Sequence, residues 1–180
     1  MSFKNDMKTT TCRYIDRLAD IDARAEKFQK ENGSKYTAVG MTEKMNEFEA
    51  ERRGVIAEGK QAILDLAENY KNSLPALFTP KGTDIAEDAK LLESDLKLSQ
   101  VDLERLWDKN DNQTMRRMIW EYSLRNNVNI SRAYYTEDMK KEAADDLARY
   151  CVMALTDKWK SSFVQSEKHY GSVVPAAVSE

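Results

Sequence analysis

The chain has 180 residues, of which 33% are charged and 41% are apolar, and its formal net charge is -3 at pH 7. This composition is typical of a folded, strongly solvated helical protein, and 3 Pro with 6 Gly are too few for the frequent turns of an all-β fold. The near balance of 28 basic and 31 acidic residues excludes a general attraction to nucleic acid or to an anionic membrane.

The first 74 residues are predicted to form two long helices that pack as an antiparallel hairpin. Residues 1–10 are polar and are expected to fray, so that Thr10 or Thr11 caps the first helix. Gly33 follows this helix and is expected to end it in a left-handed conformation. Apolar residues in between recur at alternating steps of four and three, which predicts one buried stripe: Tyr14, Leu18, Ile21, Ala25 and Phe28.

A second apolar stripe predicts a helix from Thr42, its N-cap, to Ser73, where Pro75 is expected to end it. Such a helix would be about 48 Å long and needs a partner along its side, part of which the first helix supplies. Gly54 and Gly59 lie inside it and allow two interpretations. Each is either a local weakness that costs about 1 kcal/mol relative to Ala, or a point where a neighbouring helix approaches closely.

Residues 75–83 contain two prolines and a glycine, which predicts a linker. Residues 84–135 are predicted to form a compact unit of short helices, two of which begin with capping pairs: Asp84 with Glu87, and Ser99 with Asp102. The sequence Asn110–Asn112 favours a turn, because Asn and Asp side chains bond to their own backbone there. It is expected to lead into a helix that ends near Arg125.

Residues 136–165 are predicted to form one long helix that packs back on the hairpin. Thr136 is its expected start, because acidic residues follow in the first turn. Its wide apolar stripe ends at Trp159, which is therefore expected in the core, as is Trp107 in the preceding unit. Residues 166–180 show no periodicity and are expected to be a flexible tail. Taken together, the elements predict an all-α fold.

Nothing in the sequence indicates a catalytic, metal or cofactor site. Phosphate-binding loops and dinucleotide-binding turns are absent from the sequence. The single histidine, His169, lies outside the predicted core and lacks the spacing of a metal ligand or a catalytic base. Cys12 and Cys151 are expected to be small buried thiols rather than a disulfide framework. We therefore expect no enzyme activity, no cofactor and no small-molecule ligand.

The sequence also lacks the features of a secreted or membrane protein. The first residues contain no apolar segment of the kind found in a secretory signal. The longest uncharged apolar runs are far too short to span a bilayer. We therefore expect a soluble cytoplasmic protein without a membrane partner.

A helix, a polar turn and a second helix over residues 100–125 raise the alternative of a nucleic-acid-binding regulator. Its second helix would present Arg116, Arg117 and Arg125 to a major groove. However, residues 84–135 carry 8 basic and 10 acidic side chains, and phosphate contacts dominate nucleic-acid affinity. The first two arginines can equally pair with nearby acidic residues: Asp108, Asp111 or Glu121. We therefore do not expect nucleic acid as the partner.

Trp120 is the best single candidate for a partner-binding residue. It lies beside Ile119 and shortly before Tyr122, and a helix cannot bury all three on one narrow face. Trp is also enriched at the energetic centres of protein interfaces. An apolar, proline-containing segment of the tail is a second candidate, because such segments can dock on another subunit. The candidate partner-binding residues are Trp120, Arg116 and Arg117 on the helix, and Val173, Val174 and Pro175 in the tail.

Residues 91–123, LLESDLKLSQVDLERLWDKNDNQTMRRMIWEYS, resemble segments of helical proteins encoded around the head and structural genes of phages and prophages of Gram-positive bacteria. The similarity lies in LKLS, DLERL, the Asn-rich turn and TMRRMIWEY. This resemblance implies a non-enzymatic phage protein that assembles with or decorates a capsid, in the host cytoplasm or on the virion. A phage-encoded inhibitor of a host protein would share the same interaction chemistry and stays an alternative.

The long heptad-like stripes add an expectation about oligomeric state. A helical hairpin on its own would leave apolar surface exposed, and coiled-coil contacts between copies would cover it. We therefore expect the partner to be another protein or a second copy of this chain.

Overall fold

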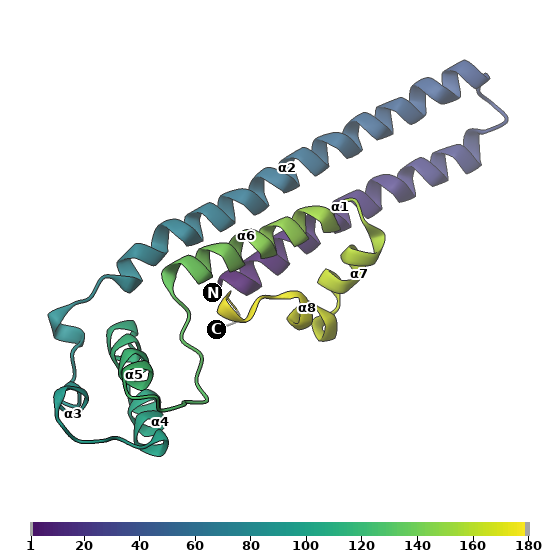
Figure 1. Ribbon diagram of the computed structural model, residues 1–180. Coiled ribbons are helices and arrows are strands. Elements are labelled where there is room, and N and C mark those ends of the chain that lie inside the picture. Colours follow the sequence, from purple (N-terminus) through teal and green to yellow (C-terminus); the bar gives the residue numbers. More distant parts are fainter. Residues whose placement is uncertain (1, 179–180) are drawn as a thin grey trace. The chain divides into compact units, whose positions relative to one another are not determined.

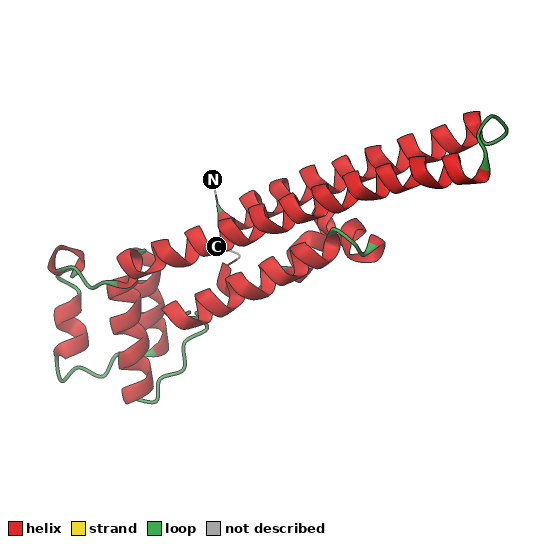
Figure 2. Ribbon diagram, turned by 90° about the horizontal axis from the view of Figure 1, so that it is seen from above, coloured by secondary structure: helices red, strands yellow, loops and turns green. Residues whose placement is uncertain are grey.

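The computed structural model describes residues 2–178, and every regular element in this range is a helix (Figures 1 and 2). The prediction of an all-α fold is therefore confirmed. The elements in chain order are α1 (Phe3–Asn32), α2 (Ala38–Phe78), the 3-10 helix η1 (Gly82–Asp84), α3 (Ala89–Glu93), α4 (Gln100–Lys109), α5 (Gln113–Arg125), α6 (Glu137–Ala154), α7 (Lys158–Gln165), α8 (Glu167–Val173) and the 3-10 helix η2 (Ala176–Val178). None of them is long and apolar enough to cross a membrane.

The chain divides into two compact units. Unit 1 comprises residues 1–71 and 140–180, and unit 2 comprises residues 72–139. These boundaries lie inside α2 and α6, whereas the sequence had suggested a linker at 75–83 and a short-helix unit over 84–135. The difference arises because a helix can pass from one unit into another without a break in its periodicity.

The segment Phe3–Thr10 is already part of α1, so the expectation of a frayed segment over residues 1–10 is wrong for these residues, and Met1 lies outside the described range. Met7 is fully buried, and the ring of Phe3 stacks on Tyr70 of α2 at a centroid distance of 4.2 Å. Thr11 does not cap the helix, because its buried hydroxyl donates to the carbonyl of Met7 at 2.7 Å inside the helix. Phe3 and Met7 lie on the same side of the helix as Tyr14 and extend its apolar stripe toward the N-terminus by about three turns.

The turn between the long helices also differs from the prediction. Gly33 has right-handed angles, φ -55° and ψ -31°, so the expected left-handed end is wrong. The second helix begins at Ala38, and its cap is Thr37, whose hydroxyl oxygen accepts the Gly40 N–H at 3.2 Å. Thr42 lies within the helix and donates to the carbonyl of Ala38 at 3.0 Å.

The helix α2 does not stop before Pro75 but continues to Phe78. Pro75 lies in the last turn, so only a single helical N–H bond is lost near the end of the ladder. Its carbonyl accepts two bonds from Thr79, from the N–H at 2.9 Å and from the hydroxyl at 2.6 Å. These bonds close the helix end and place the break after the proline.

In unit 1, the C-terminal helix α6 packs along α1 and α2 (Figures 1 and 2). Lys71 of α2 bonds to Asp145 of α6 at 2.8 Å. The buried face of α6 consists mainly of small side chains, which allow close packing: Ala143, Ala144, Leu147, Ala148, Cys151 and Ala154. Cys151 is fully buried as expected, whereas Cys12 is only half-buried.

Gly54 and Gly59 of α2 differ: one is a local weakness and the other is a point of close helix approach. A Cβ atom at Gly59 would meet Tyr14 Cγ at 2.9 Å and Leu155 Cδ1 at 3.0 Å, so α1 and the end of α6 approach closely there. A Cβ atom at Gly54 would meet nothing within 4 Å. Gly59 is thus a packing glycine, and Gly54 is a local weakness.

Residues 136–165 do not form one helix, because α6 ends at Ala154 and α7 begins at Lys158. The carboxylate of Asp157 caps α7 by accepting the N–H groups of Trp159 and Lys160 at 2.9 and 3.2 Å. This cap starts a new helix in a new direction. Trp159 is consequently 63% exposed, and its predicted place in the core is wrong.

The segment from residue 166 is folded up to Val178, so the prediction of a flexible tail is wrong for this part. It contains α8 and η2, and the buried Tyr170 donates its hydroxyl to the carbonyl of Lys4 at 2.9 Å. Ala177 and Val178 are buried as well. Residues 179–180 of the predicted tail lie outside the described range.

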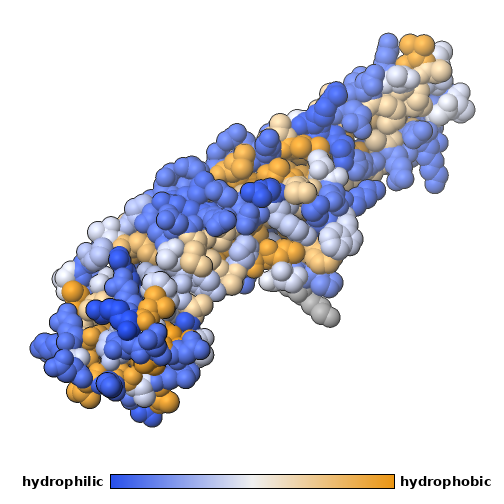
Figure 3. Space-filling view, viewed as in Figure 1, coloured by the Kyte–Doolittle hydropathy of each residue, from blue (hydrophilic) through white to orange (hydrophobic). Residues whose placement is uncertain are grey.

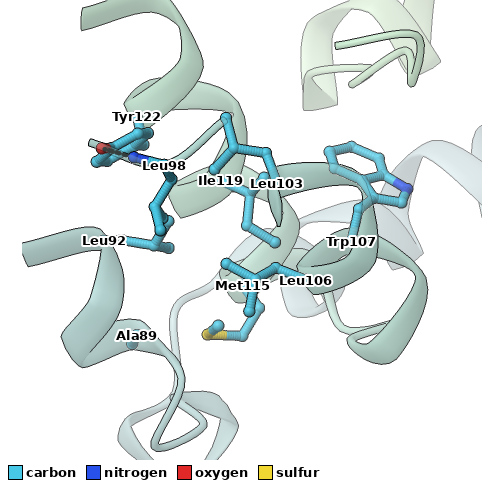
Figure 4. Packing of buried hydrophobic residues seen from close by; sticks show 9 residues of the cluster. All are labelled: Ala89, Leu92, Leu98, Leu103, Leu106, Trp107, Met115, Ile119 and Tyr122. Carbon is cyan, nitrogen blue, oxygen red and sulfur yellow. Dashed lines mark hydrogen bonds between the residues drawn. The ribbon is translucent and has the colours of Figure 1, made fainter. Parts of the chain in front are cut away.

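Unit 2 has its own hydrophobic core, formed by nine side chains that Figure 4 labels: Ala89, Leu92, Leu98, Leu103, Leu106, Trp107, Met115, Ile119 and Tyr122. The predicted capping box of α4 is confirmed, since Ser99 and Asp102 bond reciprocally. Asn112 caps α5 by accepting the Met115 N–H at 2.8 Å. Trp107 is buried, which confirms the prediction that it lies in the core.

The other predicted capping pair of unit 2, Asp84 with Glu87, is wrong. Asp84 lies in η1, and α3 begins only at Ala89 without a side-chain cap. The N–H of Ala89 bonds instead to the carbonyl of Ala86 at 2.9 Å. A backbone turn therefore replaces the expected side-chain cap.

Candidate functional site

Trp120 of α5 lines a hollow of about 370 Å³ on the surface of unit 2. The side chain is half-buried, and its ring stacks on Tyr134 with centroids 5.3 Å apart and planes at 30°. Burial raises the pKa of the Tyr134 hydroxyl, with opposing effects from nearby Arg117 and Glu121. The hollow is lined by Phe78, Arg117, Trp120, Glu121, Tyr134, Thr136, Glu137 and Asp138. It combines aromatic surface with charged groups, which suits recognition of another molecule.

The two arginines predicted to bind a partner contact residues of their own unit. Arg117 Nε donates to Glu121 Oε1 at 2.8 Å, and this hydrogen bond raises the pKa of Arg117. Arg116 lies 5.5 Å from the ring centroid of Trp107 and donates to the Asn110 carbonyl at 3.3 Å. Only Arg117 lines the hollow beside Trp120, whereas Arg116 reinforces the turn between α4 and α5.

The predicted docking segment of the tail is packed against its own unit. Val174 is buried, and Val173 and Pro175 are half-buried. The neighbouring Tyr170 hydroxyl ties this segment to Lys4 in α1. These side chains pack against other residues of unit 1, so the structure does not present them as a free docking peptide.

The part of the hairpin farthest from α6 is a larger surface that sequence reasoning did not single out. We call residues 22–53 the arm. Buried side chains end at Ile21 in α1 and resume at Val55 in α2, so the arm contains none. Its apolar seam is only half-buried: Ala25, Phe28, Met41, Met45 and Phe48. Figure 3 shows apolar residues among charged ones on the arm.

Aromatic contacts and ion pairs hold the two helices of the arm together. Phe28 lies 6.1 Å from Phe48 and 5.3 Å from Tyr36 between ring centroids. Arg24 pairs with Glu51, and Asp22 pairs with Arg52 at 3.2 Å. Exposed ion pairs are screened by water and contribute little stability, so these contacts set the register more than they stabilise the arm.

A shallow hollow of about 580 Å³ runs along one side of the arm, and we call it the arm groove. It is lined by Ala19, Asp22, Ala23, Ala25, Glu26, Gln29, Met45 and Lys158. A smaller hollow of about 140 Å³ shares Ala19, Asp22 and Lys158 with it and is also lined by Ala154 and Leu155 at the end of α6. The arm groove therefore begins where α6 ends.

A third surface feature is an aromatic stack on α7 and α8. The ring of Trp159 lies 4.3 Å from Phe163, and the ring of Phe163 lies 4.9 Å from His169. The apolar periodicity predicts Trp159 in the core because it continues across the break between α6 and α7. The acidic residue two positions before the tryptophan, Asp157, was the signal for a new helix start.

The described residues include no group of three or more His, Cys, Asp and Glu side chains placed to hold a metal ion. The geometry of the hollows offers aromatic, aliphatic and charged surfaces.

Comparison of the chain with protein-family models, curated proteins and solved structures found no match.

Proposed function

We propose that the protein is a non-enzymatic protein of phage or prophage particles, acting in their structure or assembly through protein–protein contact. The resemblance of residues 91–123 to proteins encoded around phage head genes supports the phage context. The arm supports the mode of action. This contact is made through the arm, along the arm groove.

The single observation that carries this proposal is the absence of buried side chains across residues 22–53. Helices of this length gain most of their stability from packing of an apolar face. In the arm that face is only half covered, although Phe28, Met45 and Phe48 lie along it. An apolar surface of this kind on a folded protein is typical of an interaction site.

The alternative of a nucleic-acid-binding regulator has less support. Arg117 is paired with Glu121, and Arg116 is held by Trp107 and Asn110. Phosphate binding would have to displace these contacts, in a unit with more acidic than basic side chains.

The experiment is affinity purification of the tagged protein from lysogenic cells that carry its gene. We expect structural proteins of the phage particle to be recovered with the wild type and lost with Ala23→Arg, which places a long cation in the arm groove. Ala50→Arg is the matched control, because Ala50 is an exposed alanine of the arm that does not line the groove. Recovery of no particle protein, or equal recovery with both variants, would contradict the proposal.

A further inference from the structure

The arm groove lies in line with a helix position that is already used in unit 1. Along its proximal part, the hairpin of α1 and α2 is covered by α6, whose last residue is Ala154. Beyond that residue the same side of the hairpin carries the two connected hollows. Figures 1 and 2 show α1 and α2 continuing past the end of α6. The packing of three helices, α1, α2 and α6, therefore ends at Ala154. Another helix placed on the same side of the hairpin would continue it along the arm.

We propose that the arm groove of each copy is filled by the arm of a second copy, so that two arms form an antiparallel four-helix bundle. This inference rests on the proposed function, in which the arm is the partner-binding surface, and it names the partner.

The lining of the groove suits a helix as the occupant. Ala19 and Ala23 form a wall of small side chains, and Ala25 and Met45 provide apolar surface. Small side chains let helix axes approach to the short end of the usual 8–10 Å range. The unbranched Met45 side chain can adapt to a neighbouring helix. The proximal part of the hairpin receives α6 in the same way, through a face rich in alanine.

The charge of the arm suits a second copy. Residues 22–53 contain seven basic and seven acidic side chains, so the arm is neutral while the whole chain carries -3. Two arms therefore meet without net repulsion. A two-fold interface brings one surface patch against its own copy, so the patch must be self-complementary. The groove carries Asp22 and Glu26 together with Lys158, so it presents charges of both signs.

The position of α6 determines the relative direction of the two copies. If both arms pointed the same way, each α6 would face the other α6, and these two helices would hold the arms apart. If the arms point in opposite directions, each arm lies in line with the α6 of the other copy and occupies its groove. The two-fold axis then passes near the middle of the arm, beside Glu26. Neighbouring helices in this arrangement are antiparallel, as in many four-helix bundles.

Light scattering coupled to size-exclusion chromatography tests the dimer. We expect the wild type to show twice the chain mass of 20.7 kDa at high concentration. Ala23→Arg should weaken dimerisation at least about tenfold, and Ala50→Arg should leave it unchanged. Both side chains are exposed, so neither change disturbs the fold of one copy. A wild type that stays at 20.7 kDa at every concentration, or a dimer that tolerates Ala23→Arg, would overturn the inference.

Cysteine cross-linking tests the direction of the arms. Glu26→Cys should form a disulfide-linked dimer under mild oxidation, because the position meets its own copy at the axis. Glu31→Cys is the control, since it lies about 140° away around α1. Equal cross-linking of both variants would refute this packing.

The same experiments separate this inference from the function on which it rests. A monomer that still captures particle proteins through its arm would end the inference and keep the function. A dimer that captures no particle protein would keep the inference and end the proposed function.

Discussion

Gly59 of α2 faces Tyr14 of α1 so closely that a Cβ atom on the glycine would lie 2.9 Å from Tyr14 Cγ. On another side, the same atom would lie 3.0 Å from Cδ1 of Leu155, which follows α6. Three segments of unit 1 therefore meet at a position where only hydrogen fits. Gly54, five residues earlier in α2, has open space around it, and the two glycines form a matched pair.

Gly59→Ala should lower the free energy of unfolding by about 1–3 kcal/mol, because the added methyl group overpacks a tight contact. Gly54→Ala should raise it by up to about 1 kcal/mol, because alanine favours the helix and nothing obstructs its methyl group. Urea unfolding followed by circular dichroism measures both values. An equal change of stability in the two variants would contradict the packing described for Gly59.

Tyr122→Phe should lower the stability of unit 2 by about 1–3 kcal/mol, since a buried N–H and a carbonyl lose their partner. The Tyr122 hydroxyl accepts the Leu98 N–H at 3.1 Å and donates to the Leu96 carbonyl at 2.8 Å. It thereby holds the segment between α3 and α4 against α5. Tyr135→Phe is the control, because no side-chain hydrogen bond joins Tyr135 to the other described residues. Amide hydrogen exchange at Leu98 should accelerate only in Tyr122→Phe.

Glu104→Gln should lose stability at neutral pH and show little difference from the wild type near pH 2. Hydrogen bonds from Gln100 and Ser131 lower the pKa of Glu104 from 4.5 to about 2. The unfolded carboxylate therefore takes up a proton before the folded one, so the stabilisation exists above about pH 4.5 and disappears as the pH falls toward 2. Unfolding curves at several pH values measure this, with the exposed Glu93→Gln as control. A stability difference that does not change with pH would contradict it.

Cys151 should resist thiol reagents in the folded protein, because it is fully buried and burial raises its pKa from 9.0 to about 11. In a Cys12→Ala variant, an aromatic disulfide reagent at pH 8 should react only at the rate of unfolding. The unfolded thiol ionises first as the pH rises, so this residue also makes the fold less stable between about pH 9 and 11. Rapid labelling without denaturant would show that the site is open.

Several locally encoded features could be predicted from the sequence, although the capping pair expected from Asp84 and Glu87 was wrong. The Ser99 and Asp102 pair, the Asn112 cap and the polar break before α6 each depend on residues within one turn of one another. Their side chains satisfy backbone groups that any helix start exposes, whatever the surrounding fold. The capping pair of α4 and the turn before α5 were therefore predicted correctly.

Features that depend on distant residues could not be predicted. Pro75 is a local exception: it was expected to end the helix, but Thr79, four residues later, bonds to its carbonyl and the helix continues to Phe78. The tail became ordered through Tyr170 and Lys4, which are remote in sequence. The arm has the same apolar periodicity as the rest of the hairpin. Only the length of α6 and the break at Asp157 show which part lacks a covering helix.

Because the chain is synthesised from its N-terminus, the segments that form unit 1 become available for folding at different times. Its two long helices emerge first, but Tyr14 and Gly59 lack their contact with Leu155 until the C-terminal segments have been made. At about 5–20 residues per second, the hairpin waits several seconds for α6 while unit 2 is completed in between. During that interval the whole apolar side of the hairpin is exposed, and neighbouring nascent chains on one message can meet through it. Pairing of copies during translation would then precede the closure of each unit 1.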